Sequence, residues 1–235
     1  VVILNRNKKT GSEVAETISK SGGEALSLVS DVLNRELLEQ NKKDIISKYG
    51  KIDILINLAG GNMAGATIPP DKTFFDLDIS AFRQVVDLNL FGTVIPTMVF
   101  AEDMVTRKRG SIINISSESS LRPLTRVVGY GCAKSAINNY TQFMAGELAM
   151  KFGEGLRVNA IAPGFFLTEQ NRALMTNPDG SPSDRCKSII SHTPFKRLGV
   201  PEELLGTVHW LASDASSFVT GTVIPVDGGF NAFSI

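Results

Sequence analysis

The sequence predicts a doubly wound parallel α/β fold, and three observations support this. Short apolar runs rich in Val and Ile alternate with longer stretches in which apolar residues recur at three- and four-residue spacing. The runs are continuously apolar, as expected of parallel strands covered by helices on both faces. The chain has 235 residues, of which 43% are hydrophobic, enough for one large core. We therefore expect a single Rossmann-like domain over residues 1–235.

The apolar runs predicted to be strands are Val1–Leu4, Ala25–Val29, Ile52–Asn57, Ser111–Ser116, Leu156–Ile161 and Thr222–Val226. The periodic stretches predicted to be helices are Lys9–Lys20, Arg35–Lys48, Ile79–Arg107, Tyr130–Phe152 and Pro201–Ser213. The last stretch begins with a proline followed by two glutamates. Proline suits the first helical turn, and acidic side chains suit the positive end of the helix dipole.

The segment at about 168–199 interrupts this alternation. It carries Pro178, Gly180, Pro182 and Pro194 among polar side chains. Long loops in compact domains often carry function, so we predict a mobile loop that covers a substrate site. The alternative is a solvated surface loop without a role.

Charge and cysteine content narrow the possible partners. Lys plus Arg equals Asp plus Glu at 24 each, so no overall field favours nucleic acid or an anionic membrane. No apolar run approaches the ~18 to 20 residues of a membrane span, and no secretory leader opens the chain. The two cysteines, Cys132 and Cys186, suit a reducing compartment without a disulfide framework. We expect a cytoplasmic protein with a small-molecule substrate and no nucleic-acid or membrane partner.

Tyr130 and Lys134 stand four residues apart on a predicted helix and therefore side by side on one face. A tyrosine of pKa ~10 is a poor base at neutral pH, but a neighbouring ammonium and a positively charged cofactor would stabilise its phenolate and lower that pKa. Ser117 lies thirteen residues before Tyr130 at the end of a predicted strand, where parallel-sheet enzymes place functional groups. The pattern predicts proton exchange by Tyr130 and polarisation of a carbonyl by Ser117. A surface pair is the alternative for the tyrosine and lysine.

Two further features suit a binding site. Asn57, Ala59 and Gly60 follow a predicted strand, and small residues there allow a flat cofactor to approach the backbone. Asn89 falls in the middle of a predicted helix, where asparagine is a mediocre residue and needs a partner or a purpose. A locally satisfied core asparagine is the alternative.

Together these residues resemble the short-chain dehydrogenase/reductase family from Val1 to about Phe233. The family's tetrad falls on Asn89, Ser117, Tyr130 and Lys134, and its NAG motif falls on Asn57, Ala59 and Gly60. The resemblance implies an NAD(P)-dependent oxidoreductase that interconverts a secondary alcohol and a ketone. It also implies that Lys134 holds the nicotinamide ribose and that Asn89 fixes a helix carbonyl and a water for proton relay.

The resemblance also implies the other cofactor contacts. Asp31 and Val32 look like the family's adenine contact, and Pro163, Gly164 and Thr168 like its nicotinamide-side turn. Asp227-Gly228-Gly229 resembles the family's closing motif. The family's first strand and Gly-rich turn are absent from this sequence. A nucleotide-binding relative without catalysis is therefore the alternative of a different class.

Cofactor choice in such folds depends on the end of the strand before the ribose, which here carries Asn5 and Arg6. An arginine can bind a 2′-phosphate with paired hydrogen bonds, whereas a carboxylate would repel it. We expect NAD(P)(H) with a slight preference for NADP. Arg6 could equally stack on adenine or face solvent.

The substrate is inferred from polar residues around the predicted site. Gln170 and Arg172, with Asn62 and either Arg122 or Arg126, suit the hydroxyls and carboxylate of a sugar acid, and Ser117 would contact its keto oxygen. The strings PGFFLTEQNR, SHTP and SSFVTGTVIPVDGGFNAFS are similar to those of short-chain-type D-mannonate oxidoreductases, also called fructuronate reductases. That resemblance implies NAD, in conflict with Arg6. Relatives of gluconate 5-dehydrogenase or of 3-oxoacyl-carrier reductases are the alternatives.

The predicted helices Ile79–Arg107 and Tyr130–Phe152 carry more apolar residues than one sheet face should cover. We therefore expect a homo-oligomer, and the family resemblance implies a tetramer or a dimer.

Overall fold

A computed structural model describes residues 1–168 and 171–232, apart from the side chain of Ala173. Its strands are β1 (Val2–Asn5), β2 (Leu26–Val29), β3 (Ile54–Asn57), β4 (Gly110–Ile115), β5 (Leu156–Pro163) and β6 (Val223–Val226). All pairing between them is parallel. The order β1-β2 forms one sheet and the order β3-β4-β5-β6 forms another. The predicted parallel α/β class is confirmed, although the described strands form two sheets where we expected one.

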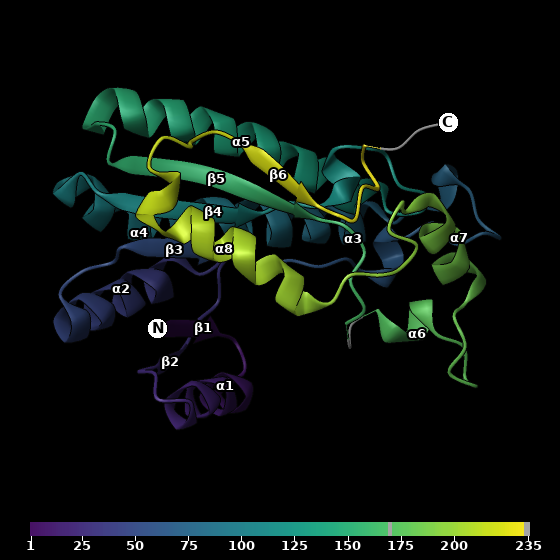
Figure 1. Cartoon of the computed structure of the whole chain (residues 1–235), viewed down its shortest axis with the longest axis horizontal. Helices are drawn as coiled ribbons and strands as arrows, with labels where there is room; N and C mark the ends of the chain where they lie inside the picture. The colour runs from purple at the N-terminus through teal and green to yellow at the C-terminus, as the bar shows by residue number, and fades with distance from the viewer. Residues whose placement is uncertain (169–170, 233–235) are drawn as a thin grey trace.

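The helices are α1 (Lys8–Lys20), α2 (Arg35–Tyr49), α3 (Ile79–Val86), α4 (Gly92–Arg107), α5 (Val128–Phe152), α6 (Arg172–Met175), α7 (Asp184–His192) and α8 (Leu205–Ala212). In Figure 1, α5 and α8 lie on opposite sides of β5. Helix boundaries follow local chemistry. The Asn34 side chain accepts a hydrogen bond from Leu37 N at 2.9 Å and begins α2, and Gly50 with φ +78° ends it.

The core is divided between the two faces of the larger sheet. Ile112 of β4 packs with residues of α4 and α5, including Met104 and Leu148. The next residue, Ile113, points to the other face and packs with Leu211 of α8. Successive strand residues alternate between the faces, so the continuously apolar runs of the sequence serve both layers.

The predicted helix Ile79–Arg107 is helical throughout but changes its winding. A π-helical turn, Asp87–Phe91, separates α3 from α4. The segment is long and apolar enough by length and composition to cross a membrane, and 50% of its most apolar window is buried inside the protein. The sequence prediction that no segment reaches this length and apolarity is therefore wrong. A buried core helix meets the same criterion.

The segment expected to be a loop at about 168–199 contains α6 and α7. Both lie beyond the carboxyl ends of β5 and β6 (Figure 1). Ser183 begins α7 by accepting a hydrogen bond from Cys186 N at 3.2 Å. Cys186 and Ile189 then pack with Met175 against partly buried residues that include Phe165 and Leu167. The prolines and the glycine of this segment lie outside the two helices. Their number made the sequence resemble a loop, although α7 has a short apolar face.

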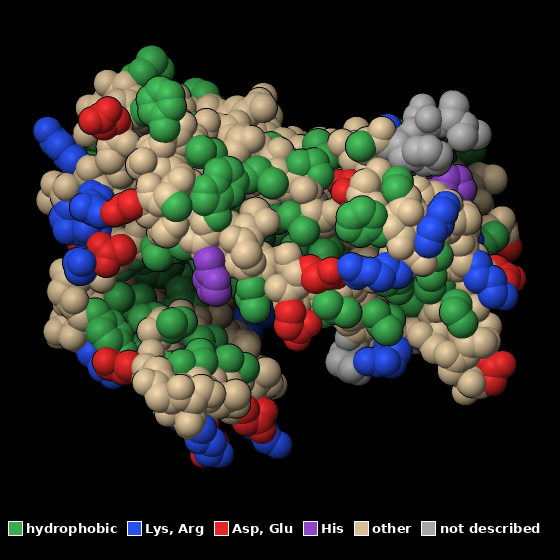
Figure 2. Space-filling view, viewed as in Figure 1, with side chains coloured by type: hydrophobic (Ala, Val, Ile, Leu, Met, Phe, Trp, Pro, Cys, Tyr) green, Lys and Arg blue, Asp and Glu red, His purple; other side chains and the backbone are tan. Residues whose placement is uncertain are grey.

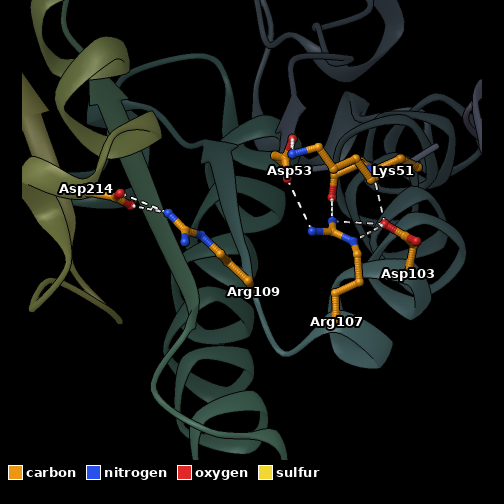
Figure 3. A network of polar contacts seen from close by, with 7 residues as sticks. Lys51, Asp53, Asp103, Arg107, Arg109 and Asp214 are labelled. Carbon is orange, nitrogen blue, oxygen red and sulfur yellow. Dashed lines mark hydrogen bonds and ion pairs between the residues drawn. The ribbon is translucent and has the colours of Figure 1, made fainter. Parts of the chain in front are cut away.

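Polar contacts fix the sheet at its other end, away from the carboxyl ends of the strands (Figure 3). Arg107, at the end of α4, donates to Asp103 at 2.9 Å, to Asp53 at 3.2 Å and to the Ile52 carbonyl. Asp103 in turn accepts from Ile52 N at 2.9 Å. These contacts hold the start of β3 against α4. On the face seen in Figure 2, cationic and anionic side chains are interspersed, in keeping with the equal totals of 24.

Candidate active site

The predicted tetrad comes together at the carboxyl ends of β3 and β4. Lys134 Nζ donates to the Ile115 carbonyl at 2.7 Å and lies 5.5 Å from the centre of the Tyr130 ring. The Ser117 hydroxyl, just after β4, lies close enough to Tyr130 to lower the pKa of its hydroxyl. A Cβ placed on Gly60 would lie 2.7 Å from Asn89 Oδ1 and 3.3 Å from Lys134 Nζ. Residues far apart in sequence therefore converge on one small volume.

Asn89 owes its position to the π-helical turn. Its amide nitrogen donates to Gly61 O at 2.7 Å and to Val85 O at 2.8 Å. Its amide oxygen accepts from Gly61 N at 3.1 Å. The side chain is fully buried, and these contacts satisfy it as burial requires. Asn89 thus fixes the loop after β3 by bonding both backbone groups of Gly61.

Ser117 is held at the start of a short 3-10 turn, Glu118–Ser120. Its hydroxyl oxygen accepts a hydrogen bond from Ser119 N at 3.2 Å. The single hydroxyl proton of Ser117 stays available for another acceptor, and the effect of Ser117 on the pKa of Tyr130 shows that the two hydroxyl groups are neighbours.

The electrostatics of the pair differ from the sequence expectation. Burial raises the pKa of Tyr130, and the hydrogen bond from Ser117 opposes this by lowering it. Burial lowers the pKa of Lys134 to about 8, because a charged ammonium is disfavoured where water is excluded. The expectation that Lys134 lowers the pKa of Tyr130 is not met in the protein alone, where Ser117 exerts the lowering.

The residues present fit a nicotinamide nucleotide at this edge of the sheet. Gly60 leaves open the space that any side chain would fill between Asn89 and Lys134. Lys134 is 4% exposed, and its ammonium has donors to spare after its bond to Ile115 O. The remaining N–H donors of Lys134 can bind ribose hydroxyl groups, and the absence of a side chain at Gly60 leaves room for a flat nicotinamide ring.

The proposed adenosine end lies at β1 and after β2. The Asn5 amide oxygen accepts from Asn7 N at 2.9 Å, and Arg6 beside it is exposed. The Asp31 carboxylate accepts from Leu33 N at 3.0 Å. The structure thus places Asn5 at the carboxyl end of β1, and Arg6 and Asp31 just beyond the carboxyl ends of β1 and β2. Their cofactor contacts remain predictions, as does the contact of Val32.

Asn57 has a structural role that its motif did not reveal. Its amide nitrogen donates to Thr97 at 3.0 Å and to Asn114 at 2.8 Å, and its side chain is buried. Both amide hydrogens are therefore used to join β3 to β4 and α4. Ala59 and Gly60, two and three residues on, are partly buried and exposed respectively, and their contact with a cofactor remains a prediction.

The nicotinamide-side turn follows β5. Gly164 N donates to Val226 O at 2.9 Å, and a Cβ on Gly164 would lie 2.6 Å from the Cα of Asp227. Only glycine fits this approach between the ends of β5 and β6. Pro163 ends β5, and Thr168 N donates to the Asn171 side chain at 2.8 Å. The structure orders this turn, and its contacts with a cofactor remain predictions.

The predicted substrate residues are placed as follows. Asn62 donates to Thr67 at 2.8 Å, and its buried amide oxygen has no hydrogen-bond partner within the described residues. Arg122 donates to Asn231 at 3.3 Å and faces the C-terminal segment. Arg172 begins α6 and is exposed. Gln170 lies outside the described residues.

Two features escaped the sequence analysis. Glu118 directly follows Ser117 and is 1% exposed. Burial, and secondarily the carboxylate of Asp227, raises the pKa of Glu118 to about 8. The second feature is Arg185 on α7. Burial lowers the pKa of this guanidinium and the positive charge of Arg126 lowers it further, so the two guanidinium groups lie within electrostatic reach.

The model of the family described as "Enoyl-(Acyl carrier protein) reductase" matches residues 1–231. The uncharacterized oxidoreductase UxuB of Bacillus subtilis is 45% identical over 243 residues, which cover 100% of this chain and 86% of that protein. A crystal structure from Haemophilus influenza with bound NAD, provisionally assigned as a D-mannonate oxidoreductase, is 42% identical with a TM-score of 0.92 over 99% of this chain and 86% of its own. A gluconate 5-dehydrogenase from Burkholderia cenocepacia, in complex with NADP and tartrate, is 30% identical with a TM-score of 0.86 and the same two coverages.

Proposed function

Because the chain belongs to the short-chain dehydrogenase/reductase family, we propose that its NAD(P)-dependent redox chemistry interconverts a secondary alcohol and a ketone of a sugar acid. D-mannonate and D-fructuronate are the proposed pair. The observation that carries the chemistry is the convergence of Ser117, Tyr130 and Lys134 beside Gly60. The proposed catalytic residues are those three and Asn89.

A bound nicotinamide cofactor supplies the acceptor or donor of the hydride. In oxidation, Tyr130 takes the proton of the substrate hydroxyl while the carbon loses its hydride, and in reduction it returns that proton to the keto oxygen. Ser117 donates a hydrogen bond to the same substrate oxygen. Lys134 would hold ribose hydroxyls, and its ammonium stabilises charge on Tyr130 as the proton moves.

Asn89 acts on the loop after β3. By bonding both backbone groups of Gly61 at 2.7 and 3.1 Å, it fixes Gly60 at the floor of the proposed cofactor site. A rigid loop at this position keeps the cofactor aligned with the reacting groups. Such alignment is a major source of rate enhancement in enzymes.

Two neighbouring structures support a sugar acid, since the D-mannonate and gluconate named for them are both aldonic acids. The chain offers its own support in Arg126 and Arg185. Arg126 lies in the turn just before α5, four residues before Tyr130, and its backbone oxygen accepts from Ile68 N at 2.9 Å. Arg185 lies on α7, which packs on the segment after β5, and the charge of Arg126 lowers its pKa.

Two guanidinium groups in mutual reach repel each other unless an anion lies between them. Within the described residues neither Arg126 nor Arg185 makes a hydrogen bond or ion pair with a carboxylate. A substrate carboxylate would relieve the repulsion and gain charge-assisted hydrogen bonds. We therefore prefer this pair over Arg172 and Arg122, the candidates from sequence.

The cofactor is NAD or NADP. The exposed Arg6 at the end of β1 favours a 2′-phosphate and hence NADP, whereas the 42% identical structure holds NAD. Both cofactors therefore belong in the assay.

The test measures kcat/KM for D-mannonate and gluconate and for their neutral sugar-alcohol analogues. Arg126→Gln and Arg185→Gln should each narrow the preference for the acid about tenfold or more, since a charge-assisted hydrogen bond is worth roughly 1.5–3 kcal/mol. Lys187→Gln is the matched control, because Lys187 lies exposed on the same helix and pairs with Asp184 at 3.2 Å. A wild-type enzyme without preference for the acid would contradict the sugar-acid proposal. Undiminished preference in both arginine variants would place the carboxylate elsewhere.

A further inference from the structure

Asn138 lies on α5 one helical turn after Lys134 and therefore on the same face of the helix. That face is turned toward the end of β4 and the 3-10 turn that carries Ser117. The neighbouring Asn139 is exposed to solvent, whereas Asn138 is partly buried. The two asparagines thus meet different surroundings.

The side chain of Asn138 joins two serines that flank Ser117. Its amide oxygen accepts from Ser116 Oγ, and its amide nitrogen donates to Ser120 Oγ at 2.8 Å. Ser120 Oγ donates in turn to the carbonyl oxygen of Ser117 at 2.6 Å. Ser116 Oγ also lies 2.9 Å from Ser120 Oγ, so Ser116, Asn138 and Ser120 contact one another and lead as one chain of polar contacts to the Ser117 carbonyl.

The direction of this chain follows from the number of protons. A serine hydroxyl has one proton to donate, and that of Ser120 goes to the Ser117 carbonyl. Ser120 Oγ can then serve Asn138 only as an acceptor, so the side chain at position 138 must donate there. It also accepts from Ser116, whose hydroxyl lies nearest to the Asn138 amide oxygen. An amide meets both requirements, and a carboxylate meets only the second.

We propose that Asn138 is a positioning residue for Ser117, which it holds in register with Tyr130 through Ser120. The inference rests on the proposed roles of Ser117 and Tyr130. Asn138 touches neither substrate nor cofactor in this scheme. It fixes the backbone from which the Ser117 hydroxyl reaches Tyr130.

Two variants interrupt the chain at different points. Asn138→Asp preserves the size of the side chain and the acceptor for Ser116 but removes the donor to Ser120. The Ser120 proton is then drawn to the carboxylate and away from Ser117. Ser120→Ala removes the same bond to Ser117 without adding charge. Asn139→Asp adds the same charge one position along the helix and is the matched control.

We expect kcat to fall about tenfold in Asn138→Asp and in Ser120→Ala, as the loss of one aligning hydrogen bond predicts. The KM for the cofactor should stay within about twofold, because Lys134 keeps its bond to Ile115 O. The double variant should lose no more than either single variant, because both break one chain. Asn139→Asp should behave as wild type.

A second readout does not require turnover. The hydrogen bond from Ser117 lowers the pKa of Tyr130, so loosening Ser117 should raise it. Ultraviolet difference titration of tyrosinate, taken between each protein and the same protein with Tyr130→Phe, isolates this group from the other tyrosines. The Tyr130 titration should move to higher pH in Asn138→Asp and Ser120→Ala and stay in place in Asn139→Asp.

The outcomes separate the two proposals. If no sugar acid is turned over but the Tyr130 titration moves, the proposed function fails and the positioning role stands. If turnover is found and both variants match Asn139→Asp in kcat and in titration, the positioning role is overturned. A fall in kcat without movement of the titration would also overturn it, since that pattern indicates general loss of structure.

Discussion

Glu118 lies beside Ser117 but outside the tetrad, and its buried carboxyl group affects the stability of the protein. Its side chain is 1% exposed, and neither carboxyl oxygen has a hydrogen-bond partner among the described residues. Asp227 raises its pKa and Arg122 lowers it, but burial is the dominant cause of its rise to about 8. At neutral pH the group is therefore largely protonated, which avoids a buried charge next to Ser117.

This burial makes stability depend on pH. In the unfolded chain the Glu118 carboxyl releases its proton near pH 4.5, whereas in the folded protein it keeps the proton to about pH 8. Between these values the folded state binds more protons, so the free energy of unfolding falls as pH rises. We expect Glu118→Gln to remove this fall, so that its stability relative to wild type improves from about pH 5 to about pH 8.

Urea unfolding of both proteins at several pH values in that window checks the prediction, with the exposed Glu154→Gln as control. A difference in unfolding free energy that does not change with pH would show that Glu118 titrates normally.

At the residue scale, spacing predicted contacts better than energetics. The four-residue separation of Tyr130 and Lys134 correctly placed the two side chains together, because helical geometry fixes that distance. In the protein without cofactor the pKa of Tyr130 is set by burial, which raises it, and by Ser117, which lowers it. Neither burial nor the approach of Ser117 to Tyr130, which lie thirteen positions apart on different elements, can be predicted from residue types. Asn138 was within reach of sequence reasoning, since it continues the face of Lys134.

At the scale of elements, long periodic stretches were predicted well and local departures were not. The boundaries of α1 and α2 lie within one residue of the prediction, where asparagine caps mark the starts. The π-helical turn Asp87–Phe91 was missed, because it keeps the apolar pattern and changes only the winding. π-turns occur frequently at functional sites, and this one brings Asn89 onto Gly61. Through this π-helical turn, a helix that otherwise packs in the core contributes Asn89 to the candidate site.

The segment with α6 and α7 shows the opposite error. Turn-forming residues outnumber apolar ones there, so composition favoured a loop. α7 nevertheless forms because Ser183 caps it and two of its apolar residues, Cys186 and Ile189, pack on the segment after β5. Its stability therefore comes from tertiary contact, which local propensity does not contain. This bears on the proposed carboxylate site, since α7 carries Arg185, whose pKa is lowered by the charge of Arg126.

At the scale of the whole molecule, apolar side chains remain exposed on α5 and on the helix before it. Phe91 and Met98 are 46% and 50% exposed, and Phe143 and Met150 are 63% and 82% exposed. Each pair is separated by seven residues, which places its members on one face of a helix. These side chains support the homo-oligomer expected from the sequence.

We predict that light scattering at micromolar concentration returns a multiple of the 25.3 kDa chain mass. Phe143→Glu and Met150→Glu place a charge on the exposed apolar face of α5 and should therefore shift the protein toward the monomer. Glu154→Gln on the exposed surface should not. A mass of ~25 kDa for the unaltered protein would contradict the prediction.

The proposed function depends most on proton transfer by Tyr130, and α5 provides a matched control for it. Tyr140 lies on the same helix, and burial raises its pKa as it does that of Tyr130. Tyr140 faces Thr97, not Ser117. Replacing either tyrosine by phenylalanine keeps the ring and removes one hydroxyl.

The decisive measurement is the rate of NAD(P)H formation from D-mannonate, or from the best acid of the panel, in wild type, Tyr130→Phe and Tyr140→Phe. We predict that Tyr130→Phe loses about 10²- to 10⁴-fold in kcat, as loss of a general acid–base group does, with an unchanged circular dichroism spectrum. Tyr140→Phe should keep most of the activity. A Tyr130→Phe enzyme that retains more than about a tenth of the wild-type kcat would contradict the proposed mechanism.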